Sequence, residues 1–227
     1  MAGRLYIPPL DLERLMPGLA IDVPPVTGAN LAPRRPLSII RLEAGRPRLT
    51  QAFWGLTPPW LEVLDHAPHC ARAESLERRA MFREAFAARR CLVPAGGVYA
   101  WQPRPRGKQP YLVTRVDRGP LLLAGLWCRF HTGLTEHHDS FALITVAAND
   151  LLTPITDRLP AVIDAADAAA WLDPATPRDT LRERLAPAPG ELLGAFPVSR
   201  RVNDPDHQEA ACAYPTGPML CRNTAKE

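Results

Sequence analysis

The sequence predicts an α+β fold formed by one domain over residues 1–227. Short apolar segments bounded by Gly and Pro recur along most of the chain, which is typical of proteins with many short strands. Three segments carry apolar residues at helical spacing, and no internal repeat or linker divides the chain. With 46% hydrophobic and 22% charged residues, the chain has enough apolar material for a sizeable core.

The first half of the chain begins with a proline-rich segment, residues 1–36, that we expect to wrap over the surface without long helices. Residues 36–42 and 49–56 are predicted to form two strands joined by a turn. Residues 74–90 have the apolar spacing of a helix, with Ser75 as a candidate N-cap and two arginines at its C-terminal end.

The second half is predicted to contain further strands and two short helices. Residues 91–101 are expected to form a strand, a glycine turn and a second strand, and residues 131–139 a polar loop. The remaining predicted strands are 109–116, 120–130, 140–150, 158–164 and 196–202, and the predicted helices are 164–172 and 177–185. We expect an irregular tail from about residue 203.

The chain is mildly basic, with a formal net charge of +3. Lys108 and Lys226 are its only lysines, so arginine supplies nearly all of its 27 cationic side chains. The planar Arg fork suits phosphate, but a GC-rich genome also produces an abundance of Ala, Pro and Arg. We therefore count only clustered or site-adjacent arginines as an indication of nucleic-acid binding.

The sequence contains no segment typical of a membrane span. The longest apolar run, residues 121–128, is far shorter than the ~20 residues that cross a bilayer. The N-terminus lacks a basic region followed by an apolar stretch, and the five cysteines are odd in number and scattered. We expect a cytoplasmic, monomeric protein that does not bind a membrane.

The histidines and cysteines do not predict a metal site. His66, His69 and Cys70 lie close together in the sequence, but adjacent residues of a strand point to opposite faces, so His69 and Cys70 do not chelate one ion from a regular strand. A second group of histidines falls in the predicted polar loop and has no cysteine beside it. Phosphate-binding Gly loops, paired CxxC and HExxH are absent, and we expect no cofactor.

Three tryptophans favour a binding surface. Trp54, Trp60 and Trp101 all lie beside Gly or Pro turns, where large rings tend to be partly exposed. Exposed rings interleaved with Arg are typical of surfaces that bind single-stranded nucleic acid, because bases stack on the rings and Arg contacts phosphate. The alternative interpretation is that these rings pack in the core and under turns.

Taken in order, a set of short stretches indicates a family. They are GR at 3–4, NLAP at 30–33, FWGLTPPW at 53–60, CARAES at 70–75, RRCLVPAGGVYAW at 89–101, AGLW at 124–127, SFALITVAAND at 140–150, TDRLPAVI at 156–163 and PVSRRV at 197–202. This succession resembles the SRAP family, the SOS-response-associated proteins that act on abasic sites in single-stranded DNA. The resemblance implies a mixed, mostly antiparallel, branched sheet with a barrel-like core flanked by helices, and a DNA groove that ends at the N-terminal residue.

The resemblance also implies a chemistry that this sequence has lost. In the family, removal of the initiator Met exposes a Cys whose amine and thiol close a thiazolidine on the abasic aldehyde, supported by an Asn, a Glu and a His. The residues at these places are Ala2, Cys70, Ala100 and Thr156. Four departures indicate a natural copy without the crosslinking activity, and retention of Met1 would also move the reactive amine by one residue.

The positions that hold DNA in the family are better kept. The matching residues are Gly3, Arg4, Asn30, Pro33, Trp54, Trp60, Arg72, Trp101, Thr145, Asp157 and Arg158. The resemblance implies that they contact single-stranded DNA or border its path. The alternative for Arg72, Asp157 and Arg158 is that they form ion pairs that fix loops, since buried charges need partners.

Three hypotheses follow for the function. The first is a non-crosslinking protein that binds single-stranded or abasic DNA. The second is a residual enzyme, in which the amine of a processed Ala2 forms an imine that leads to strand cleavage. The third is a fold reused for protein interaction, which the loss of a positive groove would favour.

Overall fold

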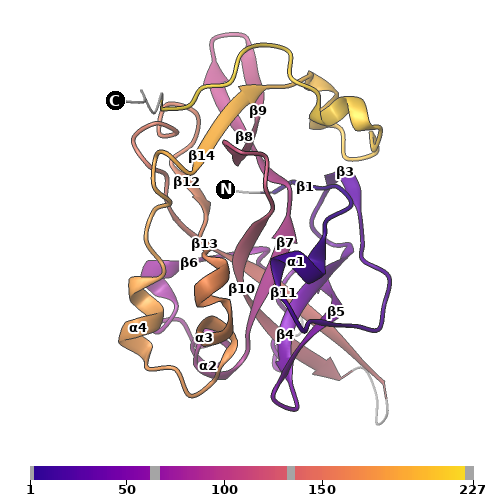
Figure 1. The fold of residues 1–227 in the computed structure, drawn as a ribbon, viewed down its shortest axis with the longest axis vertical. Helices are drawn as coiled ribbons and strands as arrows, with labels where there is room; N and C mark the ends of the chain where they lie inside the picture. Colours follow the sequence, from indigo (N-terminus) through magenta and orange to yellow (C-terminus); the bar gives the residue numbers. More distant parts are fainter. Residues whose placement is uncertain (1–2, 62–66, 132–135, 223–227) are drawn as a thin grey trace.

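The computed structural model describes residues 3–61, 67–131 and 136–222, and these form two sheets with helices on one side (Figure 1). The smaller sheet has the order β14 (Leu193–Pro197), β9 (Gly107–Arg115), β8 (Gly97–Arg104), β1 (Leu5–Ile7) and β3 (Gly28–Leu31). The larger sheet has the order β12 (Arg158–Pro160), β11 (His137–Ala147), β10 (Leu121–His131), β7 (Arg90–Ala95), β4 (Pro36–Glu43), β5 (Arg46–Trp54) and β2 (Ala20–Ile21). Two short strands branch from it, because β13 (Val162–Ile163) pairs with β10 and β6 (Cys70–Arg72) pairs with β11.

The larger sheet closes on itself. Strand β5 pairs in parallel with β11, where Phe53 lies opposite Ser140 and Trp54 opposite Phe141. This pairing joins the two ends of the run β11–β10–β7–β4–β5, so these strands form a barrel. The α+β class and the barrel-like, branched sheet expected from the sequence are confirmed.

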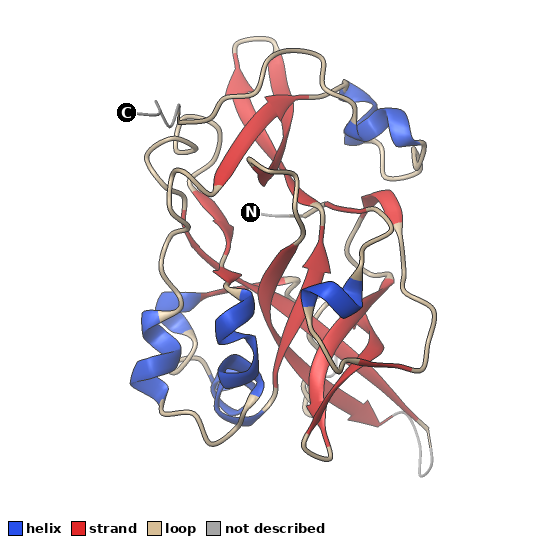
Figure 2. Cartoon of the chain, in the orientation of Figure 1, coloured by secondary structure: helices blue, strands red, loops and turns tan. Residues whose placement is uncertain are grey.

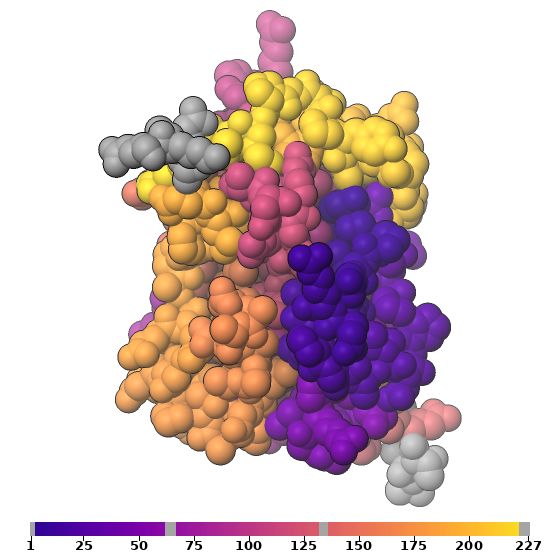
Figure 3. All heavy atoms as spheres, viewed as in Figure 1, coloured from indigo at the N-terminus to yellow at the C-terminus, as the bar shows by residue number. Residues whose placement is uncertain are grey.

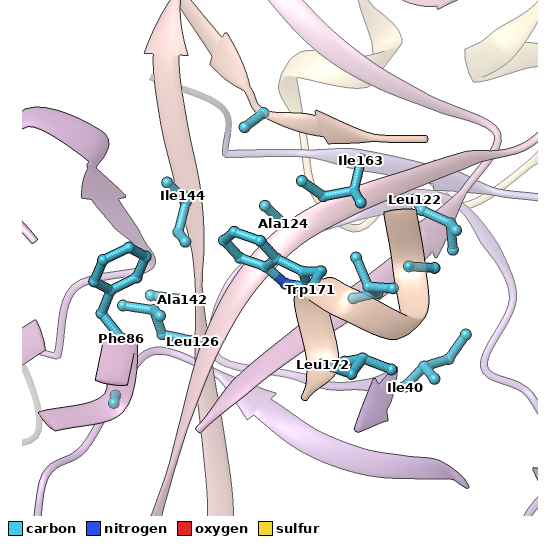
Figure 4. Packing of buried hydrophobic residues seen from close by; sticks show 14 of the residues in the cluster. Ile40, Phe86, Leu122, Ala124, Leu126, Ala142, Ile144, Ile163, Trp171 and Leu172 are labelled. Atoms are coloured by element: carbon cyan, nitrogen blue, oxygen red, sulfur yellow. The ribbon is translucent and has the colours of Figure 1, made fainter. Parts of the chain in front are cut away.

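Alternation along the barrel strands separates an inner from an outer apolar face. On β10, Leu121 and Leu123 belong to the cluster shared with the smaller sheet, whereas Leu122, Ala124 and Leu126 belong to the cluster under the helices. Figure 4 shows Trp171 lying across the outer face. Figure 2 shows that α2 (Ala80–Ala88), α3 (Ala168–Leu172) and α4 (Arg178–Glu183) gather on one side of the molecule, whereas the short α1 (Leu12–Leu15) lies apart from them.

A buried ionic cluster lies among the barrel strands. Arg41 on β4 is only 4% exposed, and its guanidinium lies 4.2 Å from the ring centre of Trp127. It donates to Asp139 Oδ2 at 2.6 Å, and Arg129 Nε donates to the other oxygen of this carboxylate at 2.9 Å. Both guanidiniums lower the pKa of Asp139, which stays ionised against the cost of burial. Both carboxylate oxygens of Asp139 therefore accept hydrogen bonds from arginines.

The N-terminal segment corrects one expectation. Residues 1–36 were expected to wrap over the surface, but this segment contributes β1, β2 and β3, and Leu5 and Ile7 are buried in the core. In Figure 3 it is the indigo mass packed beside the orange residues of the second half. Backbone pairing explains the difference, because β1 lies between β8 and β3 and forms backbone hydrogen bonds with a strand on each side.

Several predicted bounds also change. The helix expected at 74–90 is α2 preceded by a short 3-10 turn at Ala73–Ser75, and Ser75 donates to the carbonyl of Arg72 rather than capping α2. The strands expected within 91–101 are present as β7 and β8, but they lie in different sheets. The histidines expected in a loop at 131–139 lie on strands, because β10 ends at His131 and β11 begins at His137.

The C-terminal region is more ordered than expected. The strand expected at 196–202 ends at Pro197 and is followed by 3-10 turns at Arg200–Asn203 and Ala210–Ala213. The expected irregular tail packs against the small sheet through buried Cys212, and Leu220 pairs with Ala195. Helix α3 is preceded by a 3-10 turn at Ala165–Asp167, and α4 is shorter than predicted.

Truncation of Trp171 tests the outer core. Its ring is fully buried, packs on Phe86 at 6.5 Å between ring centres, and donates to the carbonyl of Cys91 at 3.0 Å. We expect Trp171→Ala to lower the free energy of unfolding by ~3–5 kcal/mol, measured by urea denaturation. Trp60→Ala is the matched control, because that ring is 57% exposed and its loss should change stability by less than ~1 kcal/mol. Equal losses in both variants would contradict this packing.

Candidate DNA-binding site

A pocket of about 470 Å³ lies between the end of β8 and the start of β12. Its lining includes five positions singled out from the sequence, namely Ala100, Trp101, Thr156, Asp157 and Arg158. Tyr99, Pro103, Lys108, Thr153, Pro154, Ile155 and Leu159 complete it. The structure therefore brings together residues that are more than fifty positions apart and belong to both sheets.

The N-terminal residues approach this pocket through β1. The amide of Tyr99 donates to the carbonyl of Arg4 at 3.1 Å, which places Gly3 and Arg4 beside Ala100. The Arg4 guanidinium donates to the carbonyl of Val202 at 3.2 Å, and burial lowers its pKa, while its Nε has no partner in the part of the chain that the structure describes. Ala2, at the position where the resemblance implies the family Cys, lies outside the described residues, as does Met1.

Cys70 is not activated as a nucleophile. It lies on β6 opposite Leu143 of β11, and burial raises the pKa of its thiol to about 12. A thiol with this pKa stays protonated at neutral pH, whereas the thiolate is the reactive form. Cys70, at the position where the resemblance implies an Asn, therefore offers no ready thiolate.

Arg158 fixes the loop before β12. Its Nη2 donates to Glu74 Oε2 at 2.8 Å and to the carbonyl of Thr145 at 2.6 Å, and its Nε donates to Thr145 Oγ1 at 3.2 Å. The hydroxyl of Thr156 donates to the carbonyl of Arg158 at 3.0 Å. The Arg158 side chain is only 12% exposed, so the loop-fixing alternative raised from the sequence describes it well.

The C-terminal segment, residues 202–208, holds the other side of the site. Trp101 Nε1 donates to Asn203 Oδ1 at 2.7 Å. The side-chain amide of Asn30 donates to the carbonyls of Val202, Asp204 and His207, and its backbone exchanges hydrogen bonds with the Gln208 side chain. Residues 203–208 were not predicted from the sequence to be part of the site. The adjoining SRRV stretch, which ends at Val202, is the sequence feature that points to this segment, and Val202 is buried in the structure.

The remaining sequence-predicted residues divide into exposed and buried groups. Arg72, Trp60 and Asp157 are exposed, and Pro33 is half-buried. The side chains of Asn30, Trp54 and Thr145 are fully buried, so their expected place in a DNA-contacting surface is corrected to a supporting one. Trp54 donates to the carbonyl of His69 at 2.8 Å and stacks on Phe141, which explains why its turn does not expose it.

The described residues offer no metal site, since none of their His, Cys, Asp and Glu side chains gather in a group of three or more. Within the described ranges, the five cysteines form no disulfide bond. Among the helices in the described ranges, none has the length and apolar character needed to cross a bilayer.

Comparison with known proteins decides the family. The model of the SOS response associated peptidase (SRAP) family matches residues 9–205. The chain belongs to the SRAP family. It is 31% identical to the abasic site processing protein YoqW of Bacillus subtilis over 180 residues, which cover 78% of this chain and 80% of YoqW. It is 28% identical to the abasic site processing protein YedK of Escherichia coli over 209 residues, which cover 90% of each chain.

Solved structures support the SRAP fold. A protein from Bacteroides thetaiotaomicron superposes with a TM-score of 0.78 at 22% identity, covering 89% of this chain and 96% of that one. A protein from Bordetella bronchiseptica superposes with a TM-score of 0.75 at 25% identity, covering 88% of this chain and all of that one. At such low identities the likeness is one of fold.

The ion pair between Glu74 and Arg158 predicts a pH dependence. The Arg158 hydrogen bond lowers the pKa of Glu74 below 4.5, so the folded state holds this proton more weakly than the unfolded state. The stabilisation is therefore present above pH 4.5 and is lost as the pH falls through the folded pKa. We expect Glu74→Gln to be less stable than the parent at pH 7, by under ~1 kcal/mol because Glu74 is 56% exposed, with the difference shrinking as the pH falls through the folded pKa.

Urea denaturation across this pH range measures the effect. Glu183→Gln is the control, because Glu183 is an exposed carboxylate on the neighbouring α4 with no ion pair among the described residues. A stability difference for Glu74→Gln that stayed constant from pH 7 to pH 3 would contradict the role of the charge.

Proposed function

We propose that this SRAP protein binds single-stranded DNA, including abasic DNA, without forming the thiazolidine crosslink implied by the family resemblance. The observation that carries the proposal is the pocket, which Ala100 and Thr156 line. The family resemblance implies a Glu and a His at these two positions. A methyl group moves no proton, and the Thr156 hydroxyl is occupied by the carbonyl of Arg158. The relatives' names as abasic site processing proteins support DNA as the ligand.

The loss of proton-transferring groups argues against efficient chemistry. Positioned acid–base groups typically contribute ~10²–10⁴-fold to a rate, and imine formation needs a proton delivered to the leaving water. Cys70 does not replace them, since burial raises the pKa of its thiol to about 12. Ala2 supplies an amine but no thiol to close a ring.

The capacity to hold DNA rests on different residues. Arg72 is exposed on β6, and Lys108 reaches the pocket from β9, so both cations are available to phosphate. Trp101 is half-buried at the pocket and Trp60 is 57% exposed, which leaves ring surface for unpaired bases. These groups favour a binding protein over a fold reused only for protein interaction.

Covalent trapping tests the loss of crosslinking. The purified protein, mixed at neutral pH with an oligonucleotide that carries one abasic site, should give no shifted band on a denaturing gel, because no thiol is present at Ala2 to close the ring. A heat-stable shifted band without reductant would overturn the proposal. A band seen only after borohydride would instead support the residual imine-forming enzyme.

Restoration tests the supporting positions. We expect Ala2→Cys alone to crosslink poorly, because Cys70, Ala100 and Thr156 leave the amine without proton transfer. The fourfold variant, which adds Cys70→Asn, Ala100→Glu and Thr156→His, should crosslink at least ~10²-fold faster in the same gel assay. Near-complete crosslinking by the single variant would show that these positions matter little.

Salt titration separates charge from stacking. We expect Arg72→Ala to reduce the slope of log affinity against log salt by a fraction of a unit, because each phosphate contact to a single strand contributes about −0.7. Trp101→Ala should weaken binding and leave the slope unchanged, because stacking releases no counterions. Fluorescence anisotropy with a short oligonucleotide measures both. Absence of binding at low salt by the folded protein would favour the interaction hypothesis. A preference for duplex would contradict single-strand binding, because exposed rings stack on unpaired bases.

A further inference from the structure

A row of exposed rings lies on the outer wall of the barrel, away from the pocket. It consists of Phe53 on β5, His138 on β11 and Phe130 on β10, and we call it the outer aromatic patch. The rings of Phe130 and His138 stack with centres 5.1 Å apart, and Phe53 meets the edge of His138 at 5.9 Å. Phe53 is 46% exposed, and both of its neighbours in the patch are half-buried.

The position of the patch explains its exposure. Helices α2, α3 and α4 cover the outer face of the barrel on one side, and the far ends of β10 and β11 point away from them (Figure 1). Outward-facing residues nearer the helices, such as Leu126 and Ala142, are completely buried. A contiguous apolar surface left open on a folded protein indicates a binding surface.

Positive charge lies beside the patch. Arg34 and Arg35 immediately precede β4, where Pro36 pairs with Phe53. The amide of Arg34 donates to the carbonyl of Trp54, and the amide of Trp54 donates to the carbonyl of Arg35, so both arginines are held against this strand. The Arg35 side chain is 61% exposed, and its contact with Asp206 is a loose 3.9 Å. Asp139, the acidic residue next to His138, is engaged with Arg41 and Arg129.

The patch is connected to the proposed DNA site through one loop. The hydroxyl of Thr57 lies 3.3 Å from the ring nitrogen of His138, and three residues later the same loop carries the exposed Trp60. Trp54, next to Phe53, donates to the carbonyl of His69 beside Cys70. The loop that carries Trp60 therefore contacts the outer aromatic patch through Thr57 and His138.

We propose that the outer aromatic patch is a second stacking surface for the unpaired bases of the same DNA strand, with Arg35 contacting its phosphates. The inference rests on the proposed function and extends it from the pocket to the wall of the barrel. Rings interleaved with arginines favour nucleic acid, because every base has a face that stacks and each phosphate meets a cation.

Substitution of Phe53 tests the patch. Fluorescence anisotropy compares a thymidine 5-mer with a thymidine 20-mer, at equal salt, for the parent, Phe53→Ala and Phe53→Leu. We expect both variants to bind the 20-mer about fivefold or more weakly and the 5-mer as the parent does, because only the longer strand spans both surfaces. Phe53→Leu keeps apolar bulk without an aromatic face. Tyr214→Ala removes a ring that is 62% exposed elsewhere and should leave both affinities unchanged.

A strand without bases separates stacking from charge. Two further 20-mers are made in which ten nucleotides are replaced by base-free spacers that keep the phosphates. The spacers occupy the 5′ half of one strand and the 3′ half of the other. For one of these two strands, we expect the affinity of the parent to equal the affinity of Phe53→Ala for the normal 20-mer. The affinity for that strand should not change further when Phe53 is substituted. Equal affinity of the parent for all three strands, with no effect of Phe53→Ala, would overturn the inference alone. Failure of the parent to bind any of the oligonucleotides would overturn the proposed function as well.

Discussion

The parallel pairing of β5 with β11 is the contact on which the rest of the molecule depends. It joins strands separated by more than eighty residues and turns an open sheet into a barrel. The same contact stacks Trp54 on Phe141, and the indole then holds the carbonyl of His69. Strand β6 is thereby aligned along β11, which carries Arg72 to Thr145 and hence to Arg158. The contact that closes the barrel therefore also positions these elements of the site.

The site is formed by residues from several strands and loops rather than by one element. The small sheet contributes Trp101 through β8, the large sheet contributes Arg158 through β12, and Asn203 accepts a hydrogen bond from the Trp101 ring. Residues that hold these elements together, such as Asn30 and Thr145, are buried and hydrogen-bonded. The departures at Ala100 and Thr156 lie on the pocket surface. The proposed loss of chemistry therefore requires no change in the buried residues that hold the site together.

Sequence patterns predicted the barrel strands well, because each is a run of apolar residues between clear turns, as around Ala44 and Gly45. They failed where pairing partners decide the structure. The proline-rich start concealed β1, since Leu5 and Ile7 form too short a pattern to show alternation. The burial of Trp54 depends on Phe141, which no local signal reveals. Closure of the barrel was implied only by the family resemblance, because parallel pairing leaves no mark in either strand.

The hydrogen bonds between Asn30 and residues 202–208 determine when this region can become ordered during translation. On the ribosome, the strand that carries Asn30 emerges early, and its side-chain amide gains its partners only when the chain has reached His207. Until then, neither Arg4 nor Trp101 has the acceptor that orients it. Domains generally fold as units as they are made, so a nascent chain cannot complete this arrangement until residues 202–208 have been synthesised. A product truncated before residue 202 would lack the acceptors that orient Arg4 and Trp101.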